Sequence, residues 1–102
     1  MIVYNVTVNI DLDAHDAWFA WMRDEHIPRV MATGLFTASR MSRVLSDDHG
    51  GITYAIQYTA VDMSMYERYR NEHAPRLQAE ANERFGGRFQ AFRTLLEVVH
   101  DA

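Results

Sequence analysis

Two segments of the chain alternate between apolar and polar residues with a period of two, which predicts half-buried β-strands. In residues 2–10 the apolar positions are Tyr4, Val6, Val8 and Ile10. In residues 52–59 they are Ile52, Tyr54, Ile56 and Tyr58. Residues 35–45, which alternate less regularly, and residues 88–99 predict a second and a fourth strand, and residues 46–51 predict a turn.

Between these strands the apolar spacing becomes helical. The first helix follows Asp11 and Asp13 and has a stripe formed by Ala14, Trp18, Trp21, Met22 and Glu25. The second follows Asp62 and has a stripe formed by Tyr66, Tyr69, His73, Leu77 and Ala81. Pro28 lacks an N–H, so we expect it to kink or restart the first helix near His26. Gly34 and Gly86-Gly87 are expected to end the two helices.

The order of elements is βαβ–βαβ, and the chain repeats itself. Residues 23–30 align with residues 70–77 at an offset of 73 − 26 = 47, and both contain Glu-His-x-Pro-Arg. A duplicated βαβ unit in one domain of residues 1–102 predicts an α+β, ferredoxin-like fold. In that fold both helices cover one face of a four-stranded antiparallel sheet.

The other face of this sheet carries neutral polar residues, namely Asn5, Thr7, Thr53, Gln57, Thr59 and Thr94. A face exposed to water usually carries more charged side chains. We therefore expect a homodimer whose sheets face each other, because symmetric dimers are the commonest oligomers. The alternative is a solvated, threonine-rich face, since threonine favours strands.

Composition excludes several kinds of partner and site. The net charge is −4, and residues 51–55 lack the basic residue and the aromatic pattern of an RNA-binding strand, which argues against nucleic acid. No apolar run approaches the roughly 18 residues of a membrane span, and the N-terminus lacks a signal peptide, so we expect a cytoplasmic protein. Without cysteine the chain has no thiol chemistry.

The repeated Glu-His-x-Pro-Arg is the best candidate for chemistry. His73 and His26 are expected to lie on or beside the apolar stripes and to act as acid or base. Glu25 and Glu72 stand four residues before Arg29 and Arg76, a spacing that allows helical ion pairs. The hypothesis is a small-molecule cleft between sheet and helices in which the arginines anchor an anion. Its aromatic walls are Trp18, Trp21, Tyr66 and Tyr69.

The same residues also allow a purely structural interpretation, in which each histidine repairs a kinked helix and the ion pairs lie on the surface. Adjacent Glu and His do not share a helix face, so we expect no metal site, and no glycine-rich cofactor loop is present. Arg93 stands among apolar residues in the last strand and needs a partner. We expect an edge position with its guanidinium in water, although a bound anion or a carboxylate of a second subunit would also serve.

The sequence resembles an uncharacterised bacterial family, a domain of unknown function. The stretches that carry the resemblance are residues 4–9, 18–36, 51–58 and 91–97. That family is similar to the wider dimeric α+β-barrel group, whose ferredoxin-like monomers pair sheet to sheet. The group includes cofactor-independent monooxygenases, haem-degrading enzymes, lactone isomerases and non-enzymatic stress proteins. The resemblance implies the fold and the dimer, and it supplies no catalytic residues.

Two functions therefore remain open. The first is a small-molecule site in each protomer, catalytic or sensory and without a cofactor. The second is a non-catalytic dimeric module that acts through contacts with other proteins.

Overall fold

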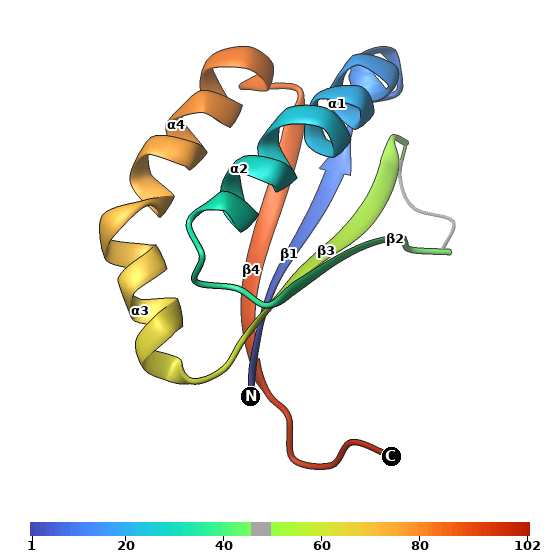
Figure 1. Ribbon diagram of the computed structural model, residues 1–102. Coiled ribbons are helices and arrows are strands. Elements are labelled where there is room, and N and C mark those ends of the chain that lie inside the picture. The colour runs from blue at the N-terminus through green and yellow to red at the C-terminus, as the bar shows by residue number, and fades with distance from the viewer. Residues whose placement is uncertain (46–49) are drawn as a thin grey trace.

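A computed structural model describes residues 1–45 and 50–102. Its first half contains β1 (Ile2–Ile10), a 3-10 turn η1 (Leu12–Ala14), α1 (His15–Trp21), a π-helical turn η2 (Met22–His26), α2 (Ile27–Ala32) and β2 (Ala38–Arg43). Its second half contains β3 (Ile52–Ala60), α3 (Met63–Glu72), α4 (Ala74–Phe85) and β4 (Phe89–Glu97). The strands form one antiparallel sheet in the order β2-β3-β1-β4, with the helices on one face (Figure 1). The ferredoxin-like fold predicted from the sequence is confirmed.

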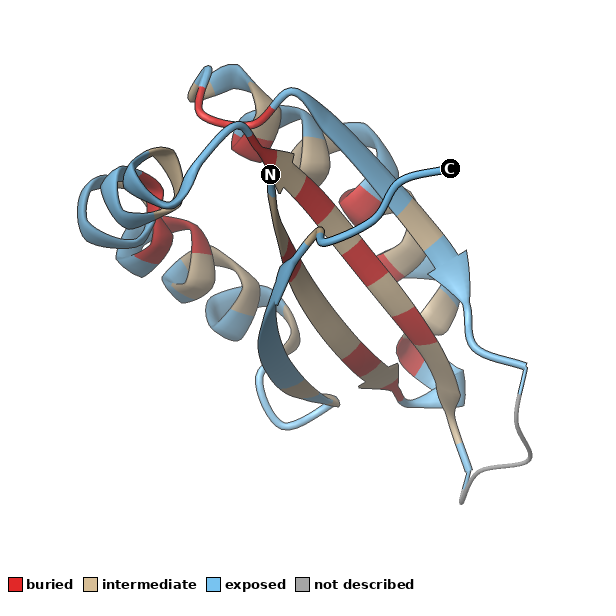
Figure 2. Cartoon of the chain, turned by 90° about the horizontal axis from the view of Figure 1, so that it is seen from below, coloured by how far each residue is buried: buried red, intermediate tan, exposed pale blue. Residues whose placement is uncertain are grey.

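The two central strands, β1 and β3, turn their predicted apolar positions toward the helices. Tyr4 lies opposite Tyr58, and Val8 lies opposite Tyr54, and all four are buried. Figure 2 shows this alternation as buried and intermediate bands along the central strands, whereas the outer strands are largely exposed. The core thus lies between one face of the sheet and the helix layer.

The second strand is shorter than predicted. Leu35 and Phe36 were assigned to it because they are apolar, but they lie before β2 and pack into the core. The Phe36 ring lies against Tyr58, with ring centroids 5.3 Å apart. The fourth strand likewise covers 89–97 rather than 88–99. Of the predicted turn over 46–51, only Gly50 and Gly51 fall within the described residues.

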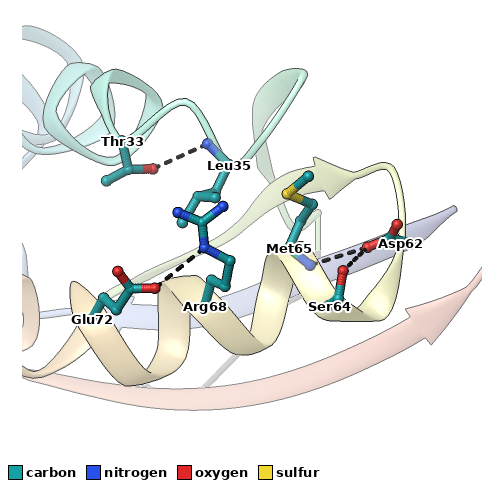
Figure 3. Close-up of polar contacts among 7 residues, drawn as sticks. All are labelled: Thr33, Leu35, Asp62, Ser64, Met65, Arg68 and Glu72. Atoms are coloured by element: carbon teal, nitrogen blue, oxygen red, sulfur yellow. Dashed lines mark hydrogen bonds and ion pairs between the residues drawn. The ribbon is translucent and has the colours of Figure 1, made fainter.

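Each of the two helices predicted from the sequence is interrupted. The first is divided into α1 and α2 by the π turn η2, and the second is divided into α3 and α4 at His73, where φ is −127°. Pro28 and Pro75 each stand in the first turn of the helix that follows the interruption, so the predicted restart near His26 is confirmed. At the start of α3, the Asp62 Oδ1 atom accepts a hydrogen bond from the Met65 backbone N–H at 3.1 Å (Figure 3).

The helices end at glycines, as expected. Gly34, with φ of 77°, follows α2, and Gly86 is the C-terminal cap of α4. Across residues 1–45 and 50–102, no helix is both long enough and apolar enough to cross a membrane.

Candidate functional site

A cavity of about 60 Å³ lies in the core between the sheet and the helices. One water needs roughly 10–15 Å³ of such space, so the cavity has room for a few waters or for part of a small ligand. Its apolar lining comes from the sheet and from both helical segments, and consists of Val6, Val8, Trp18, Met22, Ile56, Ala81, Phe89 and Ala91.

Polar side chains from several elements meet in the same cavity. They are Tyr4, His26, Tyr58, Tyr69, Gln78, Asn82 and Arg93. An apolar cavity with a few convergent polar groups is the usual form of a small-molecule site. This cavity is therefore the best candidate for one in the described part of the chain.

Arg93 enters the site from β4, which is an edge strand as expected. Arg93 is exposed, as expected from the sequence, and its Nε also donates a hydrogen bond to the Tyr4 hydroxyl at 3.1 Å. Within the described residues, no Asp or Glu forms an ion pair with Arg93. The cavity thus has a cation without a protein carboxylate beside it.

Three tyrosine rings line the side of the cavity next to Arg93. The Tyr4 ring centroid lies 6.0 Å from that of Tyr58 and 5.9 Å from that of Tyr69. Burial raises the pKa of all three phenols, and at Tyr4 the neighbouring Arg93 opposes the rise in pKa. Each phenol therefore keeps its proton near neutral pH and can donate or accept hydrogen bonds.

His26 reaches the cavity because η2 shifts the helix phase. In an unbroken α-helix, at about 100° per residue, Val30 would lie about 120° around the axis from Trp18. A π turn takes up one extra residue, which returns Val30 to within about 20° of Trp18. The same shift reduces the angle between His26 and Trp18 around the helix axis from about 80° to about 20°. His26 therefore comes to lie on the buried side of the helix. Val30 is indeed fully buried, and His26 lines the cavity.

The imidazole of His26 is held in its neutral form. Burial lowers its pKa to about 4, with Arg29 and Arg93 adding to the effect and Glu80 opposing it. Its Nδ1 atom is buried and has no hydrogen-bond partner among the described residues, and the same is true of Trp21 Nε1 and His73 Nδ1. The ring centroids of His26 and Trp21 lie 4.9 Å apart. Of the two histidines, His26 is the one that lines the cavity, where its neutral imidazole can form a hydrogen bond with a ligand.

The four aromatic residues predicted as walls take different places. Trp18 and Tyr69 line the cavity. Trp21 lies behind His26 and packs on Phe85, with ring centroids 5.6 Å apart. Tyr66 packs against Tyr4, with ring centroids 5.1 Å apart, but does not line the cavity.

The charged residues of the first repeat lie outside the cavity. Glu25 and Arg29 form the expected ion pair, with 3.5 Å between Oε1 and Nη2. Arg29 also pairs with Glu80, which joins α2 to α4 at the surface.

The second repeat departs further from expectation. His73 borders a separate shallow hollow between α2 and α4, together with Arg29 and Arg76, and does not reach the cavity that contains His26. Glu72 forms an ion pair with Arg68, with 3.3 Å between Oε2 and Nε, rather than with Arg76 (Figure 3). The predicted pair of Glu72 and Arg76 is wrong because the helix break at His73 separates them.

Sequence reasoning did not place Tyr4, Tyr58, Gln78, Asn82 and Arg93 in a site. The two tyrosines follow the core alternation and so look like packing residues. Two weak signals were available. Gln78 and Asn82 are polar residues four apart beside the apolar stripe of α4, and Arg93 interrupts an apolar strand.

No set of three His, Asp or Glu residues within the described part of the chain is arranged to hold a metal ion.

A family model described as a domain of unknown function (DUF4286) matches residues 1–99. No curated protein matches the chain. The fold resembles that of an ethyl tert-butyl ether d (ethd) family protein from Bacillus halodurans C-125, at 13% identity and a TM-score of 0.68, covering 97% of this chain and 100% of that one.

Two further structures resemble it. An antibiotic biosynthesis monooxygenase has 16% identity and a TM-score of 0.67, covering 98% of this chain and 100% of that one. A dimeric ferredoxin-like protein from an uncultured marine organism has 14% identity and a TM-score of 0.62, covering 99% and 97%. At such identities these similarities establish the fold alone.

Proposed function

We propose that this chain, which belongs to the DUF4286 family, is a homodimer in which each protomer binds a small molecule in the cavity between sheet and helices. The observation that carries the proposal is the meeting of His26 and Arg93 in one aromatic cavity. Among the described residues, Arg93 has no carboxylate partner and the neutral His26 has no hydrogen-bond partner at Nδ1, and a bound ligand could supply both.

His26 is the residue best placed to hold a polar atom of the ligand in this site. Burial lowers its pKa to about 4, so the imidazole is neutral and only weakly basic at pH 7, and it would take part in a hydrogen bond with the ligand. The protonated tyrosines and Arg93 would hold the ligand in place. Of the two histidines predicted from the repeat, only His26 is in a position to do this.

The dimer in this proposal forms through the face of the sheet opposite the helices. On that face the central strands carry neutral polar residues, β2 adds Arg40 opposite Gln57, and β4 adds Phe92 and Leu96, which are 68% and 42% exposed. A second copy of the chain would cover these apolar side chains and complete a two-sheet sandwich. One structure with the same fold is described as dimeric, which supports the proposal.

The alternative is a non-catalytic module that binds another protein. The specific observation in its favour is the exposure of Phe92, since exposed apolar patches mark interaction sites. This alternative requires no ligand in the cavity.

Native mass spectrometry of freshly purified protein tests the proposed ligand site. We expect a dimer with extra mass from a small molecule in the wild type and in His73→Gln, which changes a histidine outside the cavity. His26→Gln should lose most of that mass, with an unchanged circular dichroism spectrum. If the wild type is free of ligand and a metabolite screen by thermal shift finds no binder, the ligand site is wrong and the protein-binding alternative is favoured.

A further inference from the structure

We infer that the ligand is a small carboxylic acid bound as its monoanion, with its carboxylate at the Arg93 guanidinium beside the Tyr4 hydroxyl. This inference rests on the proposed function, because it names the chemical class of ligand for the same cavity. It follows from the charges, the unused hydrogen-bond donors and the size of the site.

The charge of the cavity lining is the first step. Among residues 1–45 and 50–102, Arg93 is the only permanently charged residue that lines the cavity, and no Asp or Glu lines it. Within residues 1–45 and 50–102, none of the ion pairs includes Arg93. Arg93 is exposed and water can solvate it, but an anion bound at the mouth of the cavity would give this guanidinium a charged hydrogen-bond partner that the described residues do not supply.

The hydrogen-bond donors are the second step. Arg93 uses Nε to contact Tyr4, and its two terminal nitrogens have no acceptor in the described structure. A guanidinium presents its donors in a planar fork that matches the two oxygens of a carboxylate. The Tyr4 oxygen accepts from Arg93, so the Tyr4 proton can be donated to the same carboxylate in place of the Gln78 side chain, which also lies beside this hydroxyl.

The number of cations and the volume decide the class of anion. One guanidinium balances one negative charge, so a carboxylate fits better than a phosphate dianion. A cavity of about 60 Å³ takes only a few heavy atoms, and its walls are largely apolar. Arg93 is an exposed residue of an edge strand, which places the entrance beside β4 and lets a larger ligand extend outward.

Ligand titrations followed by calorimetry and by tryptophan fluorescence test this inference, because Trp18 lines the cavity. The probes are butyrate and benzoate, their amides butyramide and benzamide, and inorganic phosphate. For the wild type we expect the acids to bind at least tenfold more tightly than their amides, and phosphate to bind more weakly than the acids.

Four variants locate the carboxylate. Arg93→Met should weaken binding of the acids at least tenfold, Arg93→Lys should weaken it less, and Tyr4→Phe should weaken it severalfold. Arg43→Met, which removes an exposed arginine from the other edge strand, β2, opposite Tyr54 and away from the cavity, is the matched control and should bind like the wild type. Circular dichroism confirms that each variant is folded.

Three results would overturn the inference. Amides that bind as tightly as the acids would indicate a site for neutral ligands, and the proposed cavity function would stand. Phosphate that binds more tightly than the acids would indicate a different anion, again without affecting the cavity. Absence of binding by any acid would refute the carboxylate, and the native mass spectrum with its His26→Gln comparison would still decide whether the cavity holds another ligand.

Discussion

His26 and His73 occupy equivalent positions in the two repeated halves, yet their surroundings differ. His26 is the last residue of a π turn and lines the aromatic cavity, whereas His73 stands at a helix break and borders a surface hollow. The backbone on either side of each histidine, rather than the shared motif, decides where the imidazole points. A mutational study should therefore treat the two residues as different in kind.

The depressed pKa of His26 predicts a specific dependence of stability on pH. Its pKa is about 4 in the folded chain against about 6.5 when unfolded, so between these values the unfolded state binds more protons. The free energy of unfolding should therefore fall as the pH drops from about 6.5 to about 4. A His26 pKa lowered from 6.5 to about 4 corresponds to a loss on the order of 3 kcal/mol in the free energy of unfolding.

Urea unfolding of the wild type and of His26→Gln at pH 7 and at pH 4.5 measures this contribution. We expect the variant to lose less stability on acidification, because it has no imidazole to protonate. His100→Gln, in the exposed C-terminal tail, is the control and should behave like the wild type. An acid sensitivity that is equal in all three proteins would contradict the buried, neutral state of His26.

At the scale of elements, sequence patterns predicted the sheet better than the helices. A period of two assigns each strand residue to a face, so Tyr4 and Tyr58 were placed toward the helices correctly. The stripe of the first helix could not be followed past Pro28, because one extra residue in η2 rotates everything after it. His73 was expected to point inward because Tyr69 and Leu77 flank it, and the break at that residue removes the regular phase on which the expectation depended.

The candidate site was harder to predict than the fold. His26, Trp18 and Tyr69 were chosen because they are ionisable or aromatic residues on apolar stripes, and all three line the cavity. Arg93 was recognised as needing a partner, but nothing in the alternation of its strand shows that the side chain reaches Tyr4 on the neighbouring strand. Long polar side chains adopt directions that the period of an element does not determine.

The turn before β3 passes close to the end of β1, which makes Gly51 difficult to replace. Gly51 has φ of 75°, and a Cβ atom there would lie 2.7 Å from the backbone oxygen of Ile10. Gly34 has a similar φ of 77°, but nothing lies within 4 Å of its Cβ position. We expect Gly34→Ala to cost about 1–2 kcal/mol from backbone strain alone. Gly51→Ala should cost about 1–3 kcal/mol more, because the steric clash adds to that strain.

Equilibrium unfolding in urea compares the two glycine variants directly. Equal losses of stability would mean that the backbone conformation alone matters and that the turn can move away from β1.

At the scale of the whole molecule, the helices leave one face of the sheet uncovered (Figure 1). The charge-poor pattern of Asn5, Thr7 and Gln57 continues across the central strands, and Phe92 adds an exposed aromatic ring on β4. A dimer through this face would bury Phe92. A charge introduced at this position would then be desolvated without a partner.

We therefore expect Phe92→Arg to convert the dimer to a folded monomer. Sedimentation velocity over a range of protein concentrations measures the change. Ala79→Arg introduces the same charge on the exposed side of α4, in the helix layer, and should remain dimeric. If Phe92→Arg remains as dimeric as Ala79→Arg, the interface does not use this face.

The single layer of sheet also determines how the two proposed binding events relate to each other. The cavity lies on the helix side of β1 and β4, and the proposed dimer forms on their opposite side, so ligand and partner subunit do not compete for space. A ligand that binds monomer and dimer equally well leaves the equilibrium between them unchanged. We expect two ligands per dimer, a hyperbolic isotherm with no cooperativity, and an affinity that stays constant when the protein is diluted into monomers.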